Sequence, residues 1–318
     1  MIKVILFFLF SISVSVSALE TDNFLAEVNS PSDSTQKINE FINKHIDISL
    51  KKYSNKFRKY SCDKVRQKVL KSFRGFIVHD IEEFIDQSLE DKYVYPSRDI
   101  SNKEYYRQSI YGKEGFDHLK YFHLSRGIKV NDVVFGSDKF SHFISTGIRY
   151  FHFYQKALRK GLSEEKAMKK AIRFGTFTEK TILGWLGSKV FSYADLEANF
   201  QGFLFNKSFC DQGNPYIKKI NGTWSRVLNF DARKFVNPYW SEVFNPSAFT
   251  KWRFESVKRN LEQKYCATRN IEVLLERIGG YRKRARASFS VNHLESLRDL
   301  GKIPDGKGQL REMSCFYK

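Results

Sequence analysis

The stretch from residue 138 to 202 constrains the fold most, because its apolar and aromatic residues recur at helical steps of three and four. That spacing predicts amphipathic helices. Side chains of the kinds used in acid/base or metal chemistry lie within this apolar sequence, namely Asp138, His142, Glu179 and Asp195. We therefore expect a helical core that carries a shared polar cluster.

The first expected helix begins near Asp138. Asp138, His142 and Arg149 fall on one of its faces because three or four residues, or multiples of these steps, separate them. Short, directional polar groups on one stripe favour the polar wall of a cleft, whereas a solvent face is usually built of Lys and Glu. The simpler interpretation is that Ser137 or Asp138 caps the helix and that His142 is a hydrogen-bonded core histidine.

The second expected helix starts at Ser163 and places Glu179 on a stripe of small and apolar residues. A buried carboxylate is costly unless it is paired or protonated. Glu179 therefore needs a partner such as His142 or Lys139, or a raised pKa that suits a general acid. If the helix ends near Glu179, its side chain is instead half exposed.

A third helix is predicted by Ser192-x-x-Asp195, which is the pattern of a capping box. Asp195, Asn199 and Gly202 share a face of this helix. Gly202 would let a neighbouring helix approach closely, and Asn199 can both donate and accept hydrogen bonds to a carboxylate or a sugar hydroxyl.

The N-terminal residues predict export. Lys3 precedes an apolar run, and Val16-Ser17-Ala18 offers small residues for cleavage, so we expect a signal peptide over 1–18 and a periplasmic or secreted protein. The apolar run is too short for a membrane anchor, and we expect no transmembrane segment in the mature chain. The four cysteines, spaced too irregularly for a zinc module, predict two disulfides whose pairing stays open. They are Cys62, Cys210, Cys266 and Cys315.

The predicted fold is mainly α, a helical core with long irregular loops. Beyond the signal peptide, the predicted organisation is a flexible leader over 19–33, N-terminal helices with wrapping loops over 34–134, the central helical core with its polar cluster over 135–206, and a basic C-terminal region of loops and helices over 207–318.

Charge indicates the class of partner. The 54 Lys and Arg exceed the 35 Asp and Glu, which gives a net charge of +19 and favours acidic partners. Export makes cell-wall polymers or an anionic envelope surface the expected partners, and nucleic acid is not expected. The densest basic run is 281–286, either a solvated loop or an anion-binding patch.

Part of the stretch resembles a known family. Asp138-Lys139-x-x-His142-Phe143, then Glu179, then Ser192-x-x-Asp195-x-x-Ala198-Asn199-x-x-Gly202 is similar to the pattern of VanZ-like membrane proteins and related small periplasmic proteins. The resemblance covers residues 138–202 only, and basic residues break up the segments that cross the membrane in that family. It implies a helical core and a cell-envelope role, without a reaction to carry over.

Three hypotheses follow for function. The first is a hydrolase of peptidoglycan glycan strands with Glu179 as general acid, Asp195 and His142 as further catalytic residues, and substrate binding by Asp138, Asn199 and Arg149. The second is a non-enzymatic envelope protein whose basic surface binds anionic polymers or lipids. The third, a metal site, would use Asp138, His142, Glu179 and Asp195, whereas the first two need no cofactor. The sequence has no Gly-x-Ser-x-Gly, His-Glu-x-x-His or phosphate-loop motif.

Overall fold

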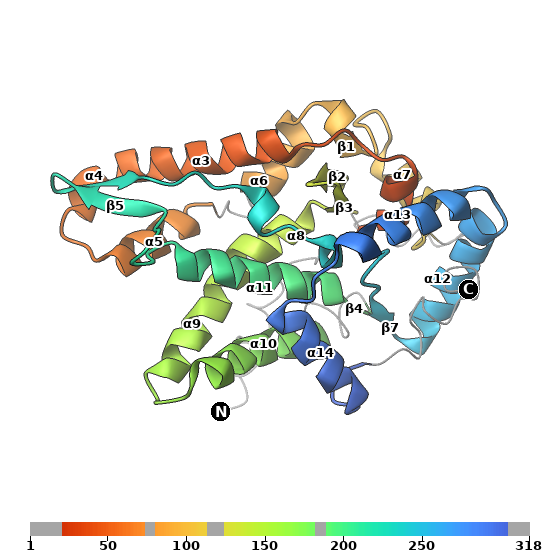
Figure 1. Cartoon of the computed structure of the whole chain (residues 1–318). Coiled ribbons are helices and arrows are strands. Elements are labelled where there is room, and N and C mark those ends of the chain that lie inside the picture. The colour runs from red at the N-terminus through yellow and green to blue at the C-terminus, as the bar shows by residue number, and fades with distance from the viewer. Residues whose placement is uncertain (1–20, 74–79, 113–123, 182–188, 305–318) are drawn as a thin grey trace, which may run out of the picture.

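The computed structural model describes residues 21–73, 80–112, 124–181 and 189–304 (Figure 1). The expected signal peptide and Cys315 lie outside them. The structure is mainly helical, with 61% helix against 9% strand. This confirms the mainly α class.

The helices and strands follow in chain order. The α-helices are α2 (Asn23–Val28), α3 (Thr35–Lys52), α4 (Ser54–Phe57), α5 (Cys62–Lys71), α6 (Asp80–Glu83), α7 (Asn102–Gln108), α8 (Asp138–Ser141), α9 (Gly147–Leu158), α10 (Glu164–Lys180), α11 (Tyr193–Ser208), α12 (Lys251–Leu261), α13 (Asn270–Arg284) and α14 (Phe289–Asp299). Wider π-helical turns are η1 (Phe84–Ser88), η4 (His142–Thr146) and η7 (Glu262–Cys266), and 3₁₀ turns are η2 (Asp91–Tyr93), η5 (Ala232–Lys234) and η6 (Pro238–Trp240). The strands are β1 (Val94–Tyr95), β2 (Gly127–Val130), β3 (Val133–Gly136), β4 (Val190–Phe191), β5 (Ile217–Ile220), β6 (Thr223–Arg226) and β7 (Ala248–Phe249).

Helix α11 lies in the middle of the molecule, with α3 on one side of it and α9 and α10 on the other (Figure 1). Nearly all of its residues are buried. Because these buried residues lie on every side of the helix, α11 is surrounded by protein, and it packs against η4, α9 and α10. Its start is fixed by Ser192, whose hydroxyl accepts from the Asp195 amide, so the predicted cap is confirmed.

The crossing of α11 over η4 is unusually close. A Cβ at Gly202 would lie 1.8 Å from the carbonyl oxygen of Phe143, and a Cβ at Gly147 would lie 2.6 Å from the carbonyl carbon of Gly202. Only glycine fits such a contact. The predicted close approach of a helix at Gly202 is therefore confirmed.

Short antiparallel strand pairs connect distant parts of the chain. Strands β1, β2 and β3 form one sheet, with Val94 opposite Ile128 and Ile128 opposite Phe135. Strand β4 pairs with β7, with Val190 opposite Phe249. This second pair holds the loop before β7 against the start of α11, and strands β5 and β6 form a separate hairpin.

The core is rich in aromatic residues. Phe143 from η4 contacts Phe205 of α11 and also Phe230, Phe235 and Trp240 from the segment after α11. Aromatic pairs in such edge and stacked arrangements stabilise a core beyond the area that they bury. The segment between α11 and α12 is thus a packed loop.

One disulfide joins Cys62 at the start of α5 to Cys210 just after α11. It closes a loop of 148 residues, and so it restricts the unfolded chain strongly. Cys266 is disulfide-bonded as well. The expectation of disulfides therefore holds for the cysteines that the structure describes.

The prediction of a flexible leader over 19–33 is wrong for residues 21–33. Helix α2 is buried, and two carboxylates, Glu27 and the capping residue Asp22, accept hydrogen bonds from distant segments. Asp22 caps α2 and accepts from the Ile110 amide at 2.6 Å, while Glu27 accepts from Ser241 and Tyr281 at 3.0 and 2.7 Å. Polar composition predicted exposure, but tertiary hydrogen bonds satisfy these groups in the interior.

Candidate functional site

A buried ammonium group is the centre of the polar cluster. Lys139 on α8 is 1% exposed, and its Nζ lies 2.7 Å from Asp138 Oδ2, 2.7 Å from Asp195 Oδ1 and 2.9 Å from Glu242 Oε1. Burial of a lysine is costly unless charges and hydrogen bonds compensate for it. Here α8, α11 and the loop before β7 each supply one carboxylate, so Lys139 joins three parts of the fold.

Asp138 extends this cluster to the N-terminal segment. Its other carboxylate oxygen, Oδ1, accepts a hydrogen bond from the Thr21 hydroxyl at 2.8 Å. Thr21 is fully buried just before α2. The cluster thus fixes the beginning of the described chain as well as its middle.

His142 lies at the more open edge of the cluster. Its Nε2 is 3.1 Å from Asp195 Oδ2, and its Nδ1 is 3.1 Å from Asn199 Oδ1. The side chains of His142 and Asp195 are 15% and 13% exposed, whereas Asn199 is fully buried. Both ring nitrogens therefore have protein partners, which hold the ring between Asp195 and Asn199.

Glu242 was not predicted from the sequence. It lies in the packed loop before β7, and its Oε1 also accepts from the Ser192 hydroxyl at 3.3 Å. The signal that could have found it is its place as the one charged residue within Tyr239-Trp240-Ser241-Glu242-Val243-Phe244. A carboxylate in such an apolar run is expected to be buried with a cationic partner.

Glu179 lies at the rim of the cluster. It is 3% exposed near the end of α10, and its Oε2 accepts from the Ser192 amide at 3.4 Å. Ser192 therefore stands between Glu179 and Glu242. The prediction that Glu179 faces inward is confirmed, and the half-exposed alternative is wrong.

The prediction that Arg149 belongs to the cluster is wrong, because its side chain is exposed. Helices α8 and α9 are joined by η4, whose π-helical hydrogen bonds span five residues instead of four. This wider turn rotates every later residue relative to Asp138 and His142. The spacing of three and four residues therefore no longer describes one face at Arg149.

The Lys139 ammonium and the carboxylates around it shift one another's pKa. Burial lowers the pKa of Lys139, but Asp138, Asp195 and Glu242 outweigh it and keep that pKa well above its ordinary value. Burial raises the pKa of Asp195, but His142 and Lys139 together outweigh burial and bring that pKa below its ordinary value. Burial raises the pKa of Glu242 to about 7 in spite of Lys139. Lys139 is thus a permanent cation.

The Lys139 ammonium also decides whether these residues could bind a metal ion. Asp138, His142 and Asp195 each offer a ligand atom, and these atoms lie within 4.8 Å of one another. Lys139 Nζ, however, already contacts both aspartates at 2.7 Å. A divalent ion between these carboxylates would have to displace a buried cation that they already neutralise, so the donor set does not fit a metal.

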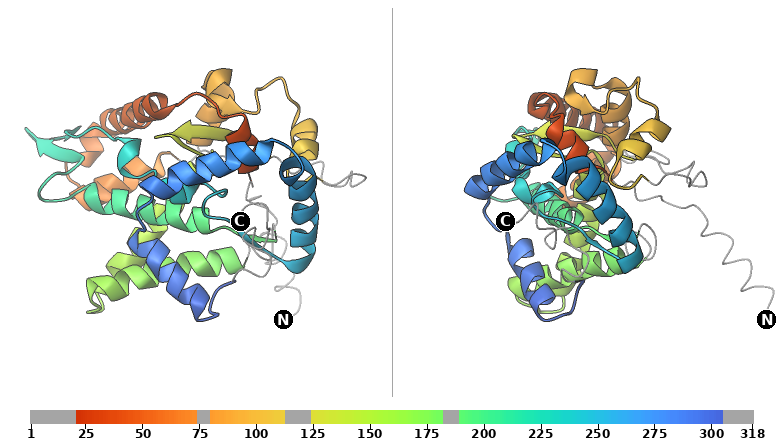
Figure 2. Two further views of the ribbon diagram at one scale, coloured as in Figure 1. Left: turned by 45° about the vertical axis from the view of Figure 1, so that its right-hand side comes forward. Right: turned by 90° about the vertical axis from the view of Figure 1, so that its right-hand side faces the viewer.

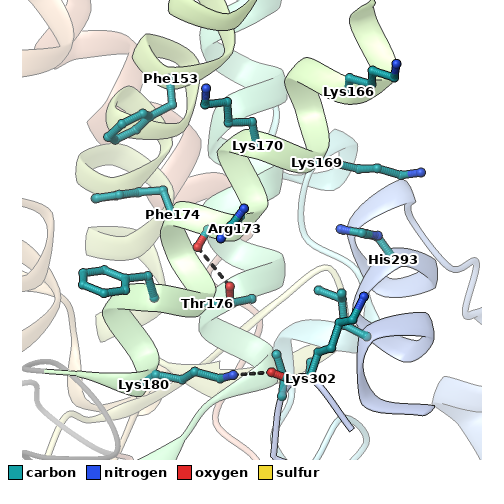
Figure 3. A pocket seen from close by; sticks show the side chains of 13 residues that line it. Phe153, Lys166, Lys169, Lys170, Arg173, Phe174, Thr176, Lys180, His293 and Lys302 are labelled. Carbon is teal, nitrogen blue, oxygen red and sulfur yellow. Dashed lines mark hydrogen bonds between the residues drawn. The ribbon is translucent and has the colours of Figure 1, made fainter. Parts of the chain in front are cut away.

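A second region, on the opposite side of α10, is strongly basic. We call it the basic pocket; it has a volume of about 940 Å³ between α10 and α14 (Figure 3). Among the described residues that line it there is no carboxylate. The lining residues are Phe153, Lys166, Lys169, Lys170, Arg173, Phe174, Thr176, Phe177, Lys180, His293, Leu297, Lys302 and Ile303. Burial lowers the pKa of His293, and nearby Lys169 lowers it further, against a smaller opposing effect of Glu165.

The sequence contained a signal for the basic pocket that the prediction did not use. Lys166, Lys170, Arg173 and Lys180 recur along α10 at steps of three, four or seven residues and so share one face. The same basic face breaks up the apolar character that a membrane-spanning segment needs.

Comparison with family models, curated proteins and solved structures finds no match. The similarity of residues 138–202 to VanZ-like proteins therefore rests on the motif residues alone. Among the described residues, none of the helices has the length and apolar character that crossing a bilayer requires.

Proposed function

We propose that this chain is an exported, non-enzymatic protein that binds an anionic surface of the cell envelope. The observation that carries the proposal is the basic pocket, where six Lys and Arg side chains line one concavity and the described lining residues include no Asp or Glu. They are Lys166, Lys169, Lys170, Arg173, Lys180 and Lys302. Like charges gathered in one hollow repel one another, so their arrangement is favourable chiefly when an anion is bound.

The buried cluster supports a structural role in this proposal. Lys139 is saturated by three carboxylates, and both ring nitrogens of His142 are engaged. A general acid must reach the glycosidic oxygen, but Glu179 is 3% exposed and accepts a backbone hydrogen bond. These contacts favour a fold that the cluster stabilises over a hydrolase that uses it.

The test is sedimentation of the purified protein, with its disulfides formed, against anionic vesicles and isolated sacculi at low and high salt. We expect binding that weakens as salt rises, because exposed charges are screened. We also expect no release of soluble glycan fragments. Binding that fails with both materials at low salt would overturn the proposal. Digestion of sacculi by the wild type, lost in a folded Glu179→Gln variant, would replace it with the hydrolase.

A further inference from the structure

The basic pocket is built from two kinds of surface. Its apolar part comes from Phe153 on α9, Phe174 and Phe177 on α10, and Leu297 on α14, with Ile303 beyond it. Phe153 and Phe174 stack with their ring centroids 4.5 Å apart. Figure 3 shows Phe153 and Phe174 on one side of the basic side chains of α10, and His293 and Lys302 on the other. The pocket therefore offers contacts to a hydrocarbon as well as to an anion.

Some of the cations are already engaged within the protein. Lys169 pairs with Glu165 at 2.6 Å, and Lys180 donates to the carbonyl oxygen of Lys302. Within the described ranges, Lys170, Arg173 and the Lys302 ammonium have no carboxylate at ion-pair distance. These three side chains are exposed and are left to bind a ligand.

Phe177 gives a second, independent observation. It is 64% exposed on α10, between the positions of Arg173 and Lys180. A large exposed aromatic ring at a basic rim is the combination found where helices lie in the interface of an anionic bilayer. The acyl chains of a bilayer would give this ring an apolar environment.

From these observations we infer that the basic pocket binds the phosphate headgroup of an anionic lipid, with Phe177 inserted among the acyl chains. The inference rests on the proposed function and names its ligand class. Arg173 offers a planar fork of donors for phosphate oxygens, and Lys170 and Lys302 add charge from α10 and from beyond α14. Phe153, Phe174 and Leu297 contact the apolar part of the lipid next to the headgroup.

The position of the pocket fits contact with a surface. Helices α10 and α14 lie side by side at one end of the molecule in both turned views (Figure 2). The buried cluster lies on the inner side of α10, because Glu179 faces inward from the same helix. The protein can therefore meet a membrane with this end while its core stays unchanged.

The experiment is co-sedimentation with phosphatidylcholine vesicles that contain or lack phosphatidylglycerol. We expect the wild type to bind only the anionic vesicles. Replacing both Lys170 and Arg173 with Glu should weaken binding by about tenfold or more, since each basic residue near an anionic surface contributes about 1 kcal/mol. Replacing both Lys44 and Lys51 with Glu, at exposed positions of α3, changes the net charge by the same amount and is the charge-matched control, which should retain most of the affinity.

A second variant tests the apolar contact. Phe177→Ser keeps every charge and should weaken binding to anionic vesicles by about fivefold, because less apolar area enters the interface. Circular dichroism and urea unfolding confirm that each variant is folded. Vesicle binding that is unchanged in both pocket variants would overturn the inference. Salt-sensitive binding to sacculi without vesicle binding would also overturn it, yet leave the broader proposed function intact, whereas binding to neither would end both.

Discussion

Lys139 and Lys170 are the same residue type in opposite settings. Lys139 is 1% exposed and touches three carboxylates from three parts of the fold, whereas Lys170 is exposed in a pocket whose described lining has no carboxylate. The chain itself therefore supplies the counter-ions of Lys139. The counter-ion of Lys170 has to come from a bound anion or from the solvent. The net charge of +19 alone does not distinguish these two uses.

The two regions also differ in how they tolerate change. The buried cluster is closed by α8, α11, η4 and the loop before β7, so each substitution there leaves a charge or a contact uncompensated. The basic pocket is lined largely by long side chains that can move into water. We therefore expect stability to depend on the first region and binding to depend on the second.

Lys139→Met gives the largest expected effect. Removing the ammonium leaves three buried carboxylates without their shared cation, and breaking a buried ion pair costs about 3–5 kcal/mol. Urea unfolding measures the loss. Lys170→Met is the matched control and should stay within about 0.5 kcal/mol of the wild type. Equal losses in the two variants would remove the distinction between the regions.

Gly202→Ala is expected to have the next largest effect. Its Cβ would lie 1.8 Å from the Phe143 carbonyl oxygen, so α11 and η4 would have to separate, at a cost of about 1–3 kcal/mol. Gly280→Ala in α13 has open space around its Cβ and should stabilise that helix by about 0.5–1 kcal/mol. Thermal unfolding of both variants checks the opposite signs. A stable Gly202→Ala protein would mean that the crossing is looser than described.

Glu242→Gln tests whether the raised pKa of Glu242 makes the stability of the protein depend on pH. The pKa of Glu242 is raised to about 7 in the folded protein, from an ordinary value of 4.5, so the folded state binds this proton more tightly than the unfolded state. This stabilisation is present at low pH and is lost as pH rises through that window. Between about pH 5 and about pH 8, the free energy of unfolding should fall in both proteins. We expect the fall in the variant to be smaller than in the wild type by about 1 kcal/mol or more.

The unfolding free energy of Glu242→Gln should still depend on pH. Burial also raises the pKa of Glu27 to about 7, and this carboxyl contributes with the same sign. Identical pH profiles for wild type and Glu242→Gln would contradict the proposed state of the cluster.

Arg173→Glu is expected to have the smallest effect on stability. Its side chain is exposed and has no described ion-pair partner, so the unfolding free energy should change by at most about 0.5 kcal/mol. Urea unfolding at moderate salt measures this change. A loss comparable to that of Lys139→Met would show that the basic pocket also stabilises the fold.

Local signals in the sequence predicted much of the central core. Ser163 and Ser192 begin α10 and α11 because their hydroxyls accept from backbone amides in the first turn, which depends only on nearby residues. The close approach at Gly202 could also be predicted locally, because it depends only on the missing side chain of that one residue. Asp138, His142, Asp195 and Asn199 also lie together, as their helical spacing indicated, although their functional roles remain predictions.

Features that depend on distant segments were not predicted. Glu242 lies in a loop without periodicity, and distant contacts hold that loop against α11, namely the pairing of β4 with β7 and the bonds of Glu242 to Lys139 and Ser192. In the sequence, the polar residues around α2 resemble a solvated leader. Their partners are distant in the chain: Ile110 donates to Asp22, and Ser241 and Tyr281 donate to Glu27. The apolar pattern does not indicate the π-helical turn η4. The spacing therefore predicts wrongly that Arg149 shares a helix face with Asp138 and His142.

Hydrogen exchange, measured with and without anionic vesicles, tests the central claim most directly because one experiment reports on both regions. The account predicts that vesicles slow exchange in α10 and α14 and leave α8, η4 and the start of α11 unchanged. Changes confined to α8 and α11, with α10 and α14 unaffected, would contradict it and place the binding site at the buried cluster instead.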